Sequence, residues 1–206
     1  MVSYRYYYFV PQLSCLAYGQ PPPMSSVAFR EKAAPMLDAK DAVLLGFVGL
    51  DVPLSEPTAD GDAPKAKGTG CEFIDGWREW EKALRLSLAR LRASGMGRED
   101  GEAESGAPGF PSSASEAAAR AMHAETPLEG EVILDKARWD AVEALQGSDL
   151  FHRKTVFAYL MKLIILERQA SFQAETGFAE YKTLYDSILE RWDSEPSGAA
   201  SMGEAK

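Results

Sequence analysis

The chain has 206 residues, of which 46% are hydrophobic, and a formal net charge of -9 at pH 7. A chain of this length can bury a core without disulfides. The negative charge argues against a nucleic-acid partner, because nucleic-acid-binding surfaces are basic. No stretch reaches the roughly 18 uninterrupted apolar residues of a membrane span, and tyrosines and Pro11 interrupt the first residues where a signal peptide needs an aliphatic run. We therefore expect a cytoplasmic protein without a membrane span.

Metal, redox and cofactor sites have no support in the residue spacing. Cys15 and Cys71 are the only cysteines and form no CxxC motif. His123 and His152 are the only histidines, and neither has a Cys, Asp or Glu three or four residues later that would complete a ligand pair on a helix. No nucleotide-binding or catalytic motif is present. We expect no cofactor, no metal and no catalytic residue, with surface or capping roles for both histidines.

Residues 1–50 are predicted to form an aromatic arm followed by short helices. The aromatic run from Tyr4 to Val10 is compatible with an extended arm or with a few helical turns. The prolines at 21–23 predict a polyproline spacer. Ser25 or Ser26 then caps a short helix that ends near Pro35, and Asp38 caps another.

Two segments rich in glycine and charge divide the rest of the chain. Residues 51–70 are predicted to be a flexible linker, because their composition offers little apolar surface to offset the entropy of ordering. Residues 71–94 form an amphipathic helix with an apolar seam that includes Trp77. Residues 95–112 are predicted to be a second linker, acidic and glycine-rich.

Residues 113–192 are predicted to be a helical region, followed by a disordered tail at 193–206. Thr126, Pro127 and Glu129 make a capping box at the start of a helix that ends at Gly147. From Phe157 to Trp192, apolar residues recur in steps of three and four, which predicts one C-terminal helix of about 40 residues with Gly177 as its weak point. The expected fold is an all-α, elongated helical bundle organised around this helix, as one composite domain.

The candidate binding residues lie on the two longest seams. Arg78, Lys82, Arg85 and Arg92 share one stripe of the 71–94 helix, which is either an ordinary solvated face or a docking stripe for an acidic protein partner; Trp77 and Tyr181 would add apolar contact area. Glu167 takes a seam position between apolar residues, where it is either a structural carboxylate or a proton-handling group.

Two patches resemble a known family: YYYFVPQL followed by PPPMSS near the start, and AYLMKLIILERQASFQAETG in the predicted long helix. Both are similar to an uncharacterised bacterial family that is encoded among the genes of V-type ATP synthases. The resemblance covers most of the chain outside the two linkers and includes no catalytic residue. The all-helical pattern and tyrosine-rich start also look like a shortened version of the funnel-shaped V-type ATPase component that joins the central rotor stalk to the membrane ring.

The resemblance implies a non-enzymatic component or assembly partner of a V-type ATP synthase, peripheral to the membrane through that complex. Its partners would be subunits on the central-stalk or membrane-ring side. The alternative is a self-associating helical adaptor, such as a homodimer, with no connection to the ATP synthase.

Overall fold

The computed structural model describes residues 6–51, 68–97, 111–172 and 181–188. These residues contain helices and no strands, which confirms the all-α class. The chain divides into two units, Met1–Gln169 and Ala170–Lys206. The first unit contains the helices α1 (Ser26–Ala33), α2 (Ala39–Leu45), α3 (Glu72–Gly95), α4 (Ser112–Met122) and α5 (Pro127–Gln146), and nearly all of α6 (Arg153–Ser171), together with the 3-10 turns η1 (Val10–Gln12) and η2 (Ala34–Met36).

Local capping signals begin three of these helices where the sequence predicts. The Ser25 hydroxyl accepts a hydrogen bond from Ala28 N (3.1 Å) at the start of α1, and the Asp38 carboxylate accepts one from Lys40 N (3.3 Å) at α2. At α5, the Thr126 hydroxyl accepts from Glu129 N while the Glu129 carboxylate accepts from Glu125 N, both at 3.1 Å. Each cap satisfies an amide that has no partner inside its helix.

The aromatic start of the chain forms turns rather than an extended arm. Residues 7–9 form a turn that leads into η1, and Phe9 is buried beside Phe29, with ring centroids 6.0 Å apart. Tyr6 N donates to the carbonyl of Phe151 at 2.7 Å, so the start of the chain is fastened to the segment between α5 and α6.

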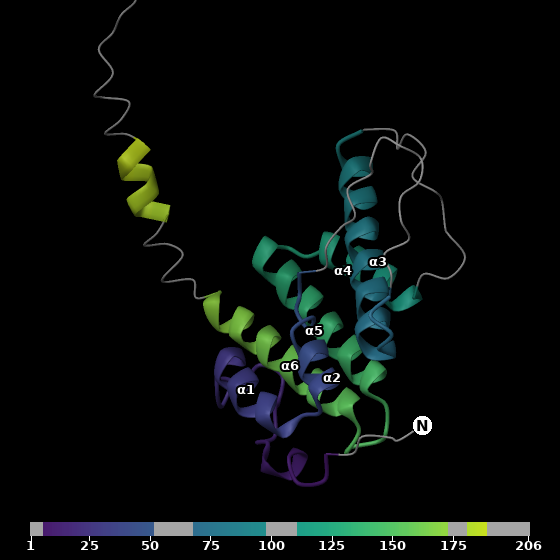
Figure 1. Cartoon of the computed structure of the whole chain (residues 1–206). Coiled ribbons are helices and arrows are strands. Elements are labelled where there is room, and N and C mark those ends of the chain that lie inside the picture. Colours follow the sequence, from purple (N-terminus) through teal and green to yellow (C-terminus); the bar gives the residue numbers. More distant parts are fainter. Residues whose placement is uncertain (1–5, 52–67, 98–110, 173–180, 189–206) are drawn as a thin grey trace, which may run out of the picture. The chain divides into compact units, whose positions relative to one another are not determined.

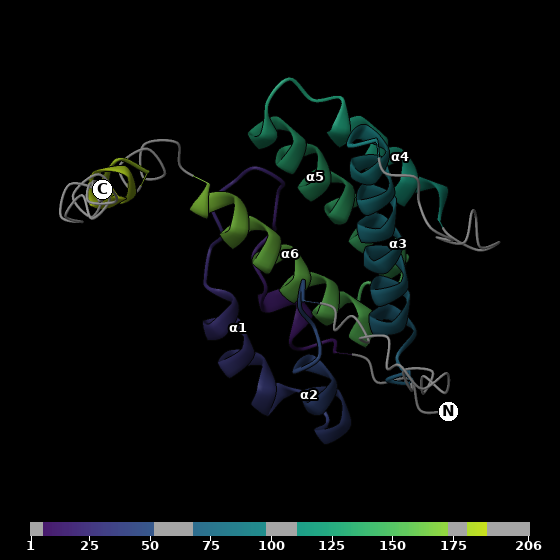
Figure 2. The ribbon, with the colours of Figure 1, turned by 90° about the horizontal axis from the view of Figure 1, so that it is seen from above.

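Helix α6 is the centre of the first unit. It runs between α1 and α2 on one side and α3 and α5 on the other (Figures 1 and 2). Tyr159 packs on Phe29 of α1, and Phe157 packs near Phe73 of α3, with ring centroids 5.0 and 6.3 Å apart. The residues from Thr155 to Met161 are all buried, so α6 is covered on every side rather than along one seam.

The predicted C-terminal helix of about 40 residues is wrong. Helix α6 has 19 residues and ends at Ser171, and the longest described helix is α3, with 24. Residues 181–188 are helical, whereas Gly177 lies outside the described residues. The physical reason is burial: α6 is enclosed as far as Leu166, but every described residue after Gln169 is exposed. Most helical stability comes from tertiary packing, which a continuous helix would lack there.

The other predicted segments fall partly outside the described residues. Helix α3 lies within one residue of the predicted 71–94. Most of the two predicted linkers, 51–70 and 95–112, and the whole predicted tail, 193–206, lie outside the part of the chain that the structure describes. Between α5 and α6, Gly147 has a φ of +72°, a conformation that favours glycine and allows the chain to turn sharply after α5.

Candidate functional site

Two members of the predicted basic stripe bind the chain's own residues 46–50. The Arg85 guanidinium donates to the carbonyl of Leu50 at 2.9 Å, and the Arg78 guanidinium lies over the Phe47 ring, 5.8 Å from its centroid. Lys82 and Arg92 are exposed. The stripe is therefore divided: its Arg78 and Arg85 positions are used within the fold, and only Lys82 and Arg92 keep the exposure that docking requires.

Trp77 and Tyr181 differ in their surroundings. Trp77 is 2% exposed, stacks on Trp80 with ring centroids 5.7 Å apart, and donates from Nε1 to the carbonyl of Gly49 at 3.1 Å. This burial removes it from the predicted contact surface. Tyr181 belongs to the second unit, is 62% exposed and stacks on Tyr185.

A network of charged side chains that sequence analysis missed connects α3, α5 and α6. Buried Glu81 accepts from Arg85 (3.0 Å) and from Arg138 (3.1 Å), and Arg138 also binds buried Asp135 at 2.8 Å. Arg168 on α6 binds the same Asp135, and it pairs with Glu131 at 2.7 Å. Burial lowers the pKa of Arg138, but the Glu81 and Asp135 carboxylates outweigh this, so its pKa is raised overall. The network holds the three helices in register.

A second buried carboxylate, Asp41 on α2, joins both ends of the first unit. Its Oδ2 accepts a 2.6 Å hydrogen bond from the Tyr6 hydroxyl, and its Oδ1 binds Arg153 of α6 at 3.2 Å. Burial, with a further contribution from the hydrogen bond to Asp41, raises the pKa of Tyr6 well above its usual value of 10.0.

This raised pKa predicts loss of stability in alkali. Because the folded chain binds the Tyr6 proton more tightly than the unfolded chain, the stabilisation is complete below a pH of about 10 and is lost as pH rises toward the higher folded pKa. We expect the free energy of unfolding to fall less steeply with pH in Tyr6→Phe than in the unsubstituted chain. Urea unfolding at a series of pH values measures this, and parallel pH profiles would contradict it.

Glu167 and the two histidines have structural partners. Glu167 Oε1 accepts a 2.6 Å hydrogen bond from Ser26 N, so this carboxylate covers the amino end of α1 from α6. His152 Nδ1 accepts from Lys154 N at 3.3 Å, and burial followed by the charge of Arg153 lowers the pKa of His152. His123 Nδ1 lies 2.8 Å from the carbonyl of Ala119. The described contacts of Glu167 thus correspond to the structural interpretation of its seam position.

Replacing Glu167 with glutamine keeps its shape but removes the charge that faces the amino end of α1. We expect the free energy of unfolding to fall by about 1 kcal/mol, since a hydrogen bond to a charged group and a helix-end charge each contribute on that order. Urea unfolding of Glu167→Gln beside Glu31→Gln, an exposed carboxylate change on α1, measures the difference. Equal stabilities of the two variants would refute the capping role.

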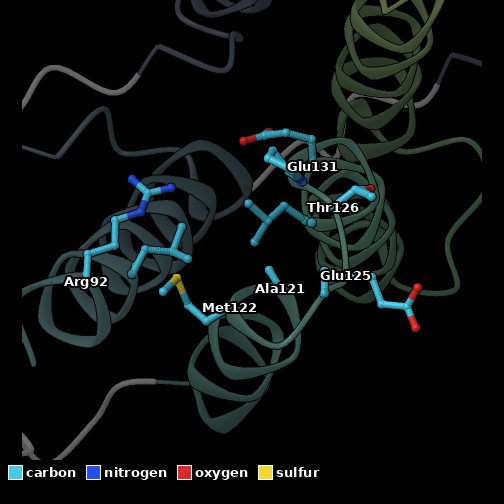
Figure 3. A pocket seen from close by; sticks show the side chains of 11 residues that line it. Arg92, Ala121, Met122, Glu125, Thr126 and Glu131 are labelled. Atoms are coloured by element: carbon cyan, nitrogen blue, oxygen red, sulfur yellow. The ribbon is translucent and has the colours of Figure 1, made fainter. Parts of the chain in front are cut away.

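A cavity of about 260 Å³ lies where α3, α4 and α5 meet (Figure 3). Its walls come from Leu88 and Arg92 of α3, from the end of α4, and from Gly130, Glu131 and Leu134 of α5. A Cβ atom at Gly130 would lie 3.1 Å from the carbonyl of Ala121, so glycine lets the first turn of α5 approach the end of α4 closely. Among the stripe residues only Arg92 lines this cavity.

The described residues contain no group of three or more His, Cys, Asp or Glu placed to hold a metal ion. Within the same residues, no helix combines the length and the apolar character needed to cross a membrane. Comparison of the chain with protein-family models, curated proteins and solved structures found no match.

Proposed function

We propose that this chain is a non-catalytic accessory component of a V-type ATP synthase and acts through contacts with other protein subunits. The observation that carries the binding role is an exposed apolar face in the second unit. Tyr181, Leu184, Tyr185 and Ile188 are between 51% and 62% exposed. They recur at positions i, i+3, i+4 and i+7 of a helical segment, which is the spacing with which an amphipathic helix occupies the groove of a partner.

The ATP synthase as target rests on the family resemblance, and the fold adds one supporting observation. The two patches that carry the resemblance are far apart in the sequence but contact each other in the first unit. Ser26 of the PPPMSS patch donates to Glu167 of the second patch, with 141 residues between them in the chain. Each patch therefore stabilises the other, as expected if both belong to one inherited structural unit rather than matching separately by chance.

The experiment that tests the proposal is gentle purification of the tagged chain from its native host, followed by mass spectrometry. ATP synthase subunits in a fixed ratio to the chain are the expected result. Recovery of the chain alone, from cells whose ATP synthase is intact, would contradict the proposal.

The alternative is a self-associating adaptor, because the same apolar face could pair with a second copy of itself. Light scattering of the isolated chain separates the two functions. A concentration-independent monomer mass is expected for the accessory component, whereas a stable dimer favours the adaptor.

A further inference from the structure

The cavity between α3, α4 and α5 has an apolar floor and a guanidinium at its mouth. Leu88 and Leu134 are 7% and 4% exposed and form part of the floor, and Met122, 40% exposed, stands at the edge. Arg92 lies on the α3 side of the opening, across from Glu131 on α5 (Figure 3). This arrangement combines a place for an apolar group with a place for a charge.

The charge that the mouth offers to a partner is positive. Glu131 is neutralised by Arg168, whose Nη2 is 2.7 Å away, and the Glu125 side chain points away from the cavity (Figure 3). Arg92 is exposed, and among the described residues it takes part in no ion pair. Its guanidinium is therefore available to a carboxylate.

The volume indicates the size of the guest. At about 260 Å³, the cavity is smaller than the roughly 300–1,000 Å³ of sites that enclose drug-sized ligands. One bulky aliphatic side chain fits such a space while the rest of its owner stays outside. A protein segment meets this requirement better than a cofactor does.

We infer that this cavity receives an aliphatic side chain of a protein partner, and that a carboxylate about one helical turn away on that partner pairs with Arg92. The inference rests on the proposed protein-binding function and narrows it. Of the predicted basic stripe, Arg78 and Arg85 contact residues 46–50 of the same chain, and Lys82 does not line the cavity. Docking is thus assigned to the carboxyl-terminal part of α3, where one cation adjoins an apolar recess.

The test uses a probe rather than the unidentified partner. The probe is a capped, alanine-rich helical peptide of about 16 residues, with one leucine and a glutamate four positions later. It is titrated to millimolar concentration into the full chain with isotope-labelled methionine methyl groups, and the Met122 methyl resonance is followed by NMR. We expect a saturable shift that is lost when the peptide leucine becomes alanine and weakens about fivefold when the peptide glutamate becomes glutamine.

Two variants of the chain separate the cavity from the stripe. Arg92→Gln is expected to weaken peptide binding about fivefold, whereas Lys82→Gln, an exposed cation of the same helix, leaves it within a factor of about two. Equal effects of the two variants, or no Met122 shift, would overturn the cavity assignment. So would a Met122 shift that follows protein concentration without peptide, because it would give the cavity to a second copy. The peptide assay contains no ATP synthase, so its failure is distinct from failure to recover that enzyme with the tagged chain.

Discussion

Replacing Glu81 with glutamine is expected to lower the free energy of unfolding by about 3 kcal/mol, because removal of one partner leaves buried charge uncompensated. The Glu81 side chain is 1% exposed and binds both Arg138, 11% exposed, and Arg85. Glutamine preserves the shape but removes the negative charge. Asp135 remains beside Arg138, which keeps the loss below that for a fully isolated cation. Urea unfolding followed by circular dichroism measures the change.

Glu79 provides the matched control, since it lies on the same helix and is exposed. Glu79→Gln is expected to change the free energy of unfolding by no more than about 0.5 kcal/mol, as surface substitutions generally do. If Glu81→Gln were no less stable than Glu79→Gln, the network would not be holding α3 against α5.

Trp77→Ala is expected to lower the free energy of unfolding by about 3–5 kcal/mol, the range for removal of a buried aromatic side chain. The substitution would open a cavity beside Trp80, which stacks on Trp77, and would leave the carbonyl of Gly49 without its indole donor. Thermal and urea unfolding measure the loss.

This prediction distinguishes a core residue from the contact residue that the sequence suggested. Trp77→Phe retains most of the buried ring and is expected to lose only about 1 kcal/mol, for the hydrogen bond. If Trp77→Ala kept the stability of the unsubstituted chain, Trp77 would belong to an exposed surface after all.

Short-range signals in the sequence predicted much of the local structure. The caps at Ser25, Asp38 and Thr126 involve partners within three residues, so residue type and spacing identify them. The seam of α3 likewise depends on a period that can be read along one helix. The length of the C-terminal helix could not be predicted in this way, since the apolar period continues beyond the part that the core of the first unit encloses.

The candidate sites depend on contacts that no local pattern contains. Glu81 and Arg138 are 57 residues apart, and each had an ordinary interpretation on its own helix. Glu81 with Arg85 and Asp135 with Arg138 do show the spacing of helical ion pairs, which is the one signal that could have drawn attention to the network. The cavity has walls from three helices. Which cations of the stripe stay exposed depends on where residues 46–50 lie against α3.

The most direct test of the protein-binding role is the amount of ATP synthase that co-purifies with the tagged chain when the exposed apolar face of the second unit is removed. Leu184→Ala combined with Tyr185→Ala is expected to reduce co-purification at least tenfold, because each side chain contributes about 1.5 kcal/mol or more when buried. Lys182→Ala, an exposed change on the same helical segment outside that face, should leave co-purification unchanged. Equal recovery of ATP synthase subunits with all three chains would contradict binding through Tyr181, Leu184, Tyr185 and Ile188.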